Sequence, residues 1–386
     1  MCIALVTTAH PDYALVVIDN RDEYILRPTS RPHWWTTKAD PVPVPRAPNT
    51  SSTTSPPHGV NGSANPAVDG TAPADVEVLS SRDLQRAERG TWLGITKDGN
   101  FAVLTNYRET NTSDVAHPVH GTRSRGGMVT AWLGAHPAES TEHFVHRMLE
   151  DGGVKGVGGF SLICGKLRRA KWDKNNIEPL AIISNRCDHA GQVPWICGRQ
   201  GSVYGLSNAT YRRPDEDPSS SDDTNEPIWP KITIGRDKLS AAVSSAPAEP
   251  QLLPSLFDIL DTEDFPPNRT LDLEQVIPLL KDSIFIPPVG GAEHQQQMEA
   301  AQRRGKTGGN PAGGETPAPE DHPNGFETGL YGTQRQTIIL VDWSGNVTYI
   351  ERALWDANGN AIPRGEGDET FRFRIEGFEQ PEELRN

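Results

Sequence analysis

Three pairs of short apolar runs, each joined by a tight polar turn, are the feature that most limits how this chain can fold. The three pairs cover residues 2–8 with 13–19, 92–96 with 101–106, and 336–342 with 347–352. Turns such as Lys97-Asp98-Gly99-Asn100 between two apolar runs are typical of β-hairpins, because Gly and Asn tolerate the backbone angles of a tight turn. The sequence therefore predicts antiparallel sheets with hairpins near both ends of the chain.

Single apolar runs and helical patterns occupy the region between the hairpins. Further strands are expected at 158–164, 180–185 and 203–207, and helices at 127–133, 141–150, 252–260 and 273–280. Helices grouped between strands favour a layered α+β fold over the strand–helix alternation of a doubly wound sheet. No Gly-x-Gly-x-x-Gly or Gly-x-x-x-x-Gly-Lys-Ser/Thr motif is present, so nucleotide binding of those two kinds is not supported.

The composition indicates that part of the chain does not pack into a core. Only 35% of the 386 residues are apolar, while glycine and proline number 36 and 33. The polar residues gather in three stretches, at 38–75, 212–226 and 295–327. Such stretches bury too little apolar surface to offset their own ordering entropy. We therefore expect a single domain over residues 1–386, interrupted by three disordered inserts.

The charge balance limits the partners and the compartment. The net charge is −14, from 37 basic and 51 acidic residues, which argues against nucleic-acid binding because phosphate contacts need a basic surface. The sequence has no run of 18 apolar residues and no basic segment at its start, so neither a transmembrane helix nor a secretory signal is expected. Four cysteines do not form a disulfide framework in a chain this long, so we expect a reducing, cytoplasmic compartment.

Cys2 is the first candidate catalytic residue. It follows the initiator methionine, and a small second residue normally permits removal of that methionine. Cys2 would then carry a free α-amino group with a pKa of roughly 7.7–8.0, which can act as the base for its own thiol. One residue would supply both nucleophile and base. The alternative is that Cys2 is a small apolar residue at the start of a strand.

A polar cluster, Asn20-Arg21-Asp22-Glu23, follows the second apolar run. In a hairpin this cluster lies at the same end of the two strands as Cys2. Asp22 could then hold the α-amine or orient the thiol, and Arg21 could lower the thiol pKa or bind a substrate carboxylate. The alternative is a solvated turn in which Arg21 and Asp22 pair with each other.

These motifs and their order resemble the NRDE family, also called transport and Golgi organisation protein 2. The resemblance begins with Cys2, the Asn-Arg-Asp-Glu cluster and the paired tryptophans Trp34 and Trp35. It extends over most of the chain, through further segments at 90–94, 104–108, 124–126, 159–162, 183–186, 204–209, 229–231, 331–333, 337–342 and 351–352. The chain is therefore identified as a member of this family on ordered motifs rather than on one pattern.

The resemblance implies a fold and a set of site residues. The family is similar to N-terminal nucleophile hydrolases, whose fold is a four-layer αββα sandwich of antiparallel sheets, and within them to the choloylglycine hydrolase and acid ceramidase group. That group has an Arg-Asn-x-Asp run, where this chain has Asp19-Asn20-Arg21-Asp22. The residues that the resemblance assigns to catalysis are Cys2, Asn20, Asp22, Asn106 and Asn208, and those assigned to substrate binding are Arg21 and Arg335.

The two additional asparagines have a chemical rationale. Attack on an amide carbonyl creates an oxyanion, and the side-chain NH₂ groups of Asn106 and Asn208 are suitable donors to it. The alternative for each is an asparagine that caps a turn. Arg335 departs from the family pattern, which is Gly-Thr-Arg, because this chain reads Gly-Thr-Gln-Arg at that place.

Two functions from different classes follow from the resemblance. The first is a cysteine amidohydrolase acting on a small-molecule amide, with a role in Golgi organisation and protein secretion. The second is a non-catalytic carrier of an apolar ligand such as haem or acyl-CoA, in haem transport or lipid metabolism. Peripheral association with the Golgi or with mitochondria is implied by the family alone. No cofactor and no metal are expected, since Cys187 and Cys197 lack the spacing of a zinc site.

Overall fold

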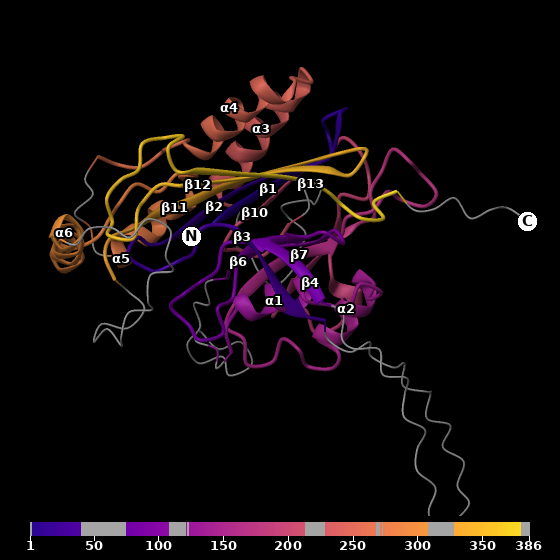
Figure 1. Ribbon diagram of the computed structural model, residues 1–386, viewed down its shortest axis with the longest axis horizontal. Coiled ribbons are helices and arrows are strands. Elements are labelled where there is room, and N and C mark those ends of the chain that lie inside the picture. The colour runs from indigo at the N-terminus through magenta and orange to yellow at the C-terminus, as the bar shows by residue number, and fades with distance from the viewer. Residues whose placement is uncertain are drawn as a thin grey trace, which may run out of the picture.

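The computed structural model describes residues 2–39, 75–107, 121, 123–212, 228–267, 271, 273–307 and 328–379. Within this part of the chain, two antiparallel sheets stack face to face and helices cover their outer faces. Figure 1 shows the resulting order of layers, with α3 and α4 above the two sheets and α1 and α2 below them.

The first sheet is assembled from distant parts of the chain. Its strand order is β10-β1-β2-β11-β12-β13, and every neighbouring pair is antiparallel. Two long strands, β2 and β11, lie at its centre, and Ile18 of β2 pairs with both Leu5 of β1 and Ile338 of β11. Its strands are β1 (Ile3–Thr7), β2 (Tyr13–Tyr24), β10 (Val203–Leu206), β11 (Tyr331–Asp342), β12 (Asn346–Ala353) and β13 (Asp368–Arg374).

The second sheet is a meander, in which each strand pairs with the next one along the chain. The hairpin predicted over 92–106 forms β5 and β6, with Gly99 in the left-handed region of its turn at φ 76°. Its strands are β3 (His33–Lys38), β4 (Asp75–Ser80), β5 (Leu93–Thr96), β6 (Asn100–Asn106), β7 (Phe160–Lys166), β8 (Leu180–Ser184) and β9 (Trp195–Ile196).

Alternation of side chains along each strand builds three apolar layers. Val17 of β2 and Ile339 of β11 pack against Ile95 and Val103 between the two sheets. The outer face of the second sheet packs against α1 (Gly126–Leu133) and α2 (Thr141–Leu149), while that of the first packs against α3 (Pro230–Ser244) and α4 (Glu249–Leu260). The predicted α+β class and αββα order are therefore confirmed.

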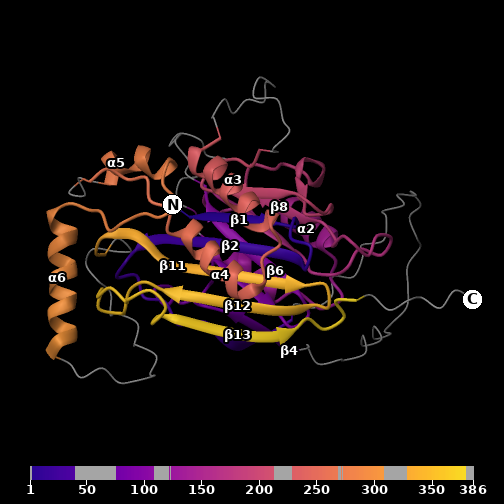
Figure 2. The same ribbon diagram turned by 90° about the horizontal axis from the view of Figure 1, so that it is seen from above.

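The prediction of a disordered insert over 295–327 is wrong for residues 295–307. Residues of this segment belong to α6 (Ala292–Thr307), where Met298 and Ala301 are buried. A segment with few apolar residues buries little surface, but it can still form a helix when its residues favour helices. Gln, Glu, Ala and Arg, which are frequent in this segment, are good helix formers. Figure 2 shows α6 beside the end of the sheets rather than over either face. Residues 308–327 lie outside the described part of the chain.

The other two predicted inserts lie mostly outside the described residues. Lys38 ends β3 and Asp75 begins β4, so the two ends of the predicted 38–75 insert are strand residues, and residues 40–74 are not described. Of the predicted 212–226 insert only Arg212 is described. The helix predicted over 273–280 consists of α5 (Leu273–Val276) followed by a 3₁₀ helix, η2 (Ile277–Lys281), and a second 3₁₀ helix, η1, spans Ala190–Gln192.

Candidate active site

A cavity of about 320 Å³ opens at one end of the two sheets. Its walls come from the start of β1, the end of β2, the residues before β5, the end of β6, and the residues before α1. Residues that line it include Cys2, Arg21, Asp22, Trp92, Asn106 and Arg125. The cavity therefore gathers, from separate parts of the chain, several of the residues singled out in the sequence, namely Cys2, Arg21, Asp22 and Asn106.

Cys2 is buried in this cavity at the start of β1. Its Sγ donates to the carbonyl oxygen of Asp22 over 3.8 Å, and the pairing of Ile3 with Asn20 places the cluster opposite it, as the hairpin predicted. Burial raises the pKa of the Cys2 thiol to about 11, and the negative charges of Asp22 and Asp19 act in the same direction. The thiol is therefore protonated near neutral pH, and nucleophilic attack would need a base.

The Asn-Arg-Asp-Glu cluster lies within β2 and not after it, because β2 continues to Tyr24. Pairing with β11 along this segment extends the strand beyond the apolar run. Alternate residues of a strand point to opposite faces of the sheet, so the cluster divides between the two faces. Arg21 shares the face of Val17, toward the second sheet, whereas Asn20 shares the face of Ile18, toward the helices.

Asn20 is held on the helix side and does not line the cavity. Its Nδ2 donates to the carbonyl oxygens of Leu260 at 2.8 Å and Ile284 at 3.0 Å. These two bonds tie the end of α4 and the segment that follows η2 (Ile277–Lys281) to the first sheet. Asp22 lines the cavity, and its Oδ1 accepts a hydrogen bond from Thr333 at 2.7 Å.

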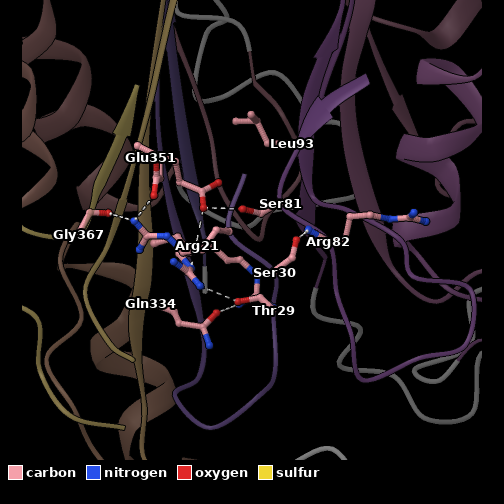
Figure 3. A network of polar contacts seen from close by, with 12 residues as sticks. Arg21, Thr29, Ser30, Ser81, Arg82, Leu93, Gln334, Glu351 and Gly367 are labelled. Atoms are coloured by element: carbon pink, nitrogen blue, oxygen red, sulfur yellow. Dashed lines mark hydrogen bonds and ion pairs between the residues drawn. The ribbon is translucent and has the colours of Figure 1, made fainter. Parts of the chain in front are cut away.

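Arg21 lies between the two sheets with its guanidinium against the indole of Trp92, 4.3 Å from the ring centroid. It also donates to Oε1 of Gln334, as Figure 3 shows. Both partners are uncharged. Arg21 is therefore a buried cation whose nearest described neighbours stabilise it by stacking and by one amide oxygen.

A β-bulge accounts for the extra residue in the Gly-Thr-Gln-Arg segment. Thr333 pairs with Asp22 and Arg335 pairs with Arg21, so Gln334 is an additional residue on β11 with no counterpart on β2. The bulge lets Gln334 reach Arg21 and also donate to the carbonyl oxygens of residues near the end of β2.

Arg335 lies behind Arg21 and is not among the cavity-lining residues. It donates to Thr29 Oγ1 at 3.0 Å, and its Nε lies 3.9 Å from Oε1 of Glu351. Burial lowers the pKa of Arg335 to about 10, and the charge of Glu351 opposes this effect. Figure 3 shows the same Glu351 accepting from Ser81 of the second sheet, so these polar groups join the two sheets.

Asn106 and Asn208 lie at or just beyond the ends of two strands near Cys2, and Asn208, two residues after β10, is not among the residues that line the cavity. Asn106 ends β6 and lines the cavity. Asn208 is buried, with no described hydrogen-bond partner for its Oδ1, and follows Ser207, whose hydroxyl donates to the Cys2 carbonyl at 2.6 Å. Thr105 in turn donates to the Ser207 carbonyl at 2.8 Å. These bonds bring both asparagine-bearing strand ends next to Cys2.

Lys231 was not singled out by the sequence reasoning, although it ends the Trp-Pro-Lys segment of the family pattern. It is fully buried in the first turn of α3. Burial lowers the pKa of its ammonium, while the negative charges of Asp22 and the Cys2 thiolate act in the opposite direction. A buried lysine whose pKa is shifted in this way is a candidate for a functional residue.

The buried carboxyl group of Asp19 should make the stability of the protein depend on pH in an unusual way. It is buried between the sheets with no described partner for either carboxylate oxygen, and burial raises its pKa well above the usual value, with Asp22 and Glu351 adding to the rise. The folded state therefore holds this proton more tightly than the unfolded state, so its contribution to stability falls as pH rises above about 4.

We expect Asp19→Asn to stabilise the protein at pH 7, because the neutral amide has no charge to desolvate, and the difference from wild type should shrink as pH approaches 4. Urea unfolding of both proteins from pH 4 to pH 8 measures this. A variant that is less stable than wild type at pH 7 would show that Asp19 is ionised and stabilising there.

The layer order is that of a four-layer αββα sandwich, with a cysteine thiol at the start of the first strand and inside a cavity at one end of the two sheets. The sequence matches the family described as Transport and Golgi organisation 2 over residues 1–45 and 68–356. The chain belongs to this family.

Relatives and solved structures resemble the chain over most of its length. The human Transport and Golgi organization protein 2 homolog is 27% identical over 347 residues, covering 89% of this chain and 88% of the relative. An uncharacterized protein of Saccharomyces cerevisiae is 23% identical over 397 residues, covering 97% of this chain and 100% of the relative.

Two solved structures align with the chain at a TM-score of 0.36. The C2A mutant of the conjugated bile acid hydrolase from Clostridium perfringens is 8% identical, with 100% of both chains covered. Penicillin V acylase from Agrobacterium tumefaciens is 10% identical, with 97% of this chain and 86% of that chain covered. Among the described residues, no helix has the length and apolar character needed to cross a membrane.

Proposed function

We propose that the protein is a cysteine amidohydrolase in which Cys2, after removal of Met1, is the nucleophile. The observation that supports this most is the position of the Cys2 thiol, at the start of β1 and inside a cavity that Asn106 also lines. The substrate is an amide small enough to enter about 320 Å³. Membership of the family supports, as part of the same proposal, a role in Golgi organisation and protein secretion from the cytoplasmic side of the membrane.

In the proposed mechanism the α-amine of Cys2 takes the proton from Sγ, and the thiolate attacks the amide carbonyl carbon. Asn106 and Asn208 donate to the oxyanion that forms, and a donor of this kind is worth roughly 10²–10³ in rate. Asp22 stabilises the α-ammonium by its negative charge. Collapse of the intermediate breaks the C–N bond, and the leaving amine takes the proton from the α-ammonium. Water then hydrolyses the thioester by the same route and restores the thiol.

One observation favours the alternative, a carrier without catalysis. Burial keeps the pKa of the Cys2 thiol at about 11, so the thiol is a poor nucleophile unless a base acts on it. In the alternative proposal the cavity holds haem or an acyl-CoA or similar lipid, and association with the Golgi or with mitochondria would serve delivery.

Intact-mass spectrometry before and after a short pulse of iodoacetamide near neutral pH, followed by peptide mapping, tests the proposal. We expect a chain without Met1 that is alkylated first at Cys2, and then turnover of at least one amide in a substrate screen. A chain that retains Met1, or a Cys2 that reacts no faster than the other buried cysteines, Cys164 and Cys197, would contradict the self-activated nucleophile and favour the carrier.

A further inference from the structure

The cavity around Cys2 carries more positive than negative side chains, although the chain as a whole carries a net charge of −14. Among the described residues that line it, five are arginines and three are acidic. Two of the acids share one arginine, because Arg27 binds Glu23 at 3.0 Å and Asp83 at 2.6 Å. The third, Asp22, accepts a hydrogen bond from Thr333, and its negative charge opposes the lowering of the Lys231 pKa by burial.

Two of the lining arginines have no carboxylate within ion-pair distance in the described part of the chain. Arg21 is 5% exposed and has Gln334 and the Trp92 ring as its partners. Arg125 is partly buried, and the partner of its guanidinium is the Gly159 carbonyl oxygen at 3.5 Å, at the limit of a hydrogen bond. A desolvated cation without a counter-charge is costly, and a bound anion would remove that cost.

The backbone holds Arg125 in place at the cavity wall. Arg125 directly precedes α1, and the first residue of that helix, Gly126, packs against Gly90 so closely that a Cβ on Gly90 would lie 2.9 Å from the Gly126 carbonyl carbon. The first turn of α1 contains no acidic residue, so the positive end of the helix is not compensated by its own side chains.

Arg125 also lies close enough to the thiol for the two charges to interact. Burial lowers the pKa of the Arg125 guanidinium, and the negative charges of Glu23 and the Cys2 thiolate oppose this, while Arg27 and Arg86 reinforce it. Arg21 and Arg125 therefore belong to the same compartment as the candidate nucleophile, one from β2 and one from the start of α1.

We propose that Arg21 and Arg125 together bind an anionic group, a carboxylate or a phosphate, on the ligand of this cavity, so that the molecule presented to Cys2 is an anionic amide. The hydrolysis of that amide rests on the proposed function, whereas the anion binding does not. Bidentate pairing with a guanidinium suits both carboxylate and phosphate oxygens.

Calorimetric titration of the full-length Cys2→Ala protein separates binding from catalysis. The probes are N-decanoylglycine, its neutral primary amide, and the phosphate monoester of N-decanoylethanolamine. We expect at least one anionic probe to bind about tenfold or more tightly than the neutral amide. The tighter of the two anionic probes identifies the group as carboxylate or phosphate. Equal binding of all three would overturn the proposal.

Arg125→Gln in the same background is expected to lose most of the anion preference, and Arg125→Lys to retain part of it. Arg374→Gln is the matched control, because Arg374 likewise donates to a backbone carbonyl, that of Ser344 at 3.0 Å, but lies at the far end of β13. A preference that survives in Arg125→Gln and in Arg125→Lys alike would overturn the assignment of Arg125.

The failure of this inference and that of the proposed function give different results. Anion preference in Cys2→Ala without turnover by the wild-type protein would leave the inference standing and contradict the amidohydrolase. If the wild-type protein hydrolyses the neutral amide as fast as the anionic amides, the amidohydrolase proposal stands and the anion-binding inference is contradicted.

Discussion

Replacing Cys2 with alanine is expected to lower amide hydrolysis by on the order of 10⁴-fold or more, because no other thiol lines the cavity among the described residues. Alanine removes only the Sγ atom, which lies beside an existing cavity, so the free energy of unfolding should change little. Steady-state rates on an amide found in the substrate screen, together with urea unfolding, measure both effects.

Two further variants separate the nucleophile from its surroundings. Cys2→Ser keeps an attacking oxygen and the α-amine, so it should retain more activity than Cys2→Ala. Cys187→Ser is the control, since Cys187 is a partly buried cysteine outside the cavity. A Cys2→Ala protein that turns over substrate at the wild-type rate would remove Cys2 from the mechanism.

Glu351→Leu is expected to destabilise the protein by about 3–5 kcal/mol, because it leaves a buried charge without its partner. Glu351 is 1% exposed, accepts from Ser81 at 2.5 Å and Tyr349 at 3.2 Å, and lies 3.9 Å from the Arg335 guanidinium. Among the described residues, Glu351 provides the carboxylate that lies within ion-pair distance of Arg335. Urea unfolding gives the change in free energy.

Two comparisons test the cause of that loss. Adding Arg335→Met to Glu351→Leu should recover much of the stability, because both charges are then absent from the interior. Glu299→Gln removes an exposed carboxylate that pairs with Arg303 on α6, and should cost no more than about 0.5 kcal/mol. A similar loss for Glu299→Gln and Glu351→Leu would show that burial of the pair is not the cause.

The local parts of the fold were predictable from the sequence because each is encoded by neighbouring residues. The hairpins with turns at Gly99 and Gly345 need only an apolar run on each side of a glycine in the left-handed region. The same hairpin logic correctly placed Cys2 opposite the Asn20–Asp22 segment. The layer order came from the family resemblance and not from these local patterns.

The parts that were not predicted depend on contacts between distant residues. Asn20 was grouped with the catalytic candidates, but the carbonyls of Leu260 and Ile284 that hold it arrive 240 and 264 residues later. Arg125 was not among the candidate site residues, because its place in the cavity wall depends on Gly126 packing against Gly90, a residue 36 positions earlier in the chain. The continuation of β2 through Asp22 likewise depends on β11, which lies more than 300 residues away in the chain.

The two sheets differ in how much of the chain must exist before each can form. The second sheet uses residues 33–196 in sequence order, whereas the first combines residues 3–24, 203–206 and 331–374. During synthesis the meander can therefore assemble early, while β1 and β2 wait for β11, since long-range pairing is the slow part of folding. Cys2 therefore belongs to a sheet that cannot be completed before residues 331–374 have been synthesised.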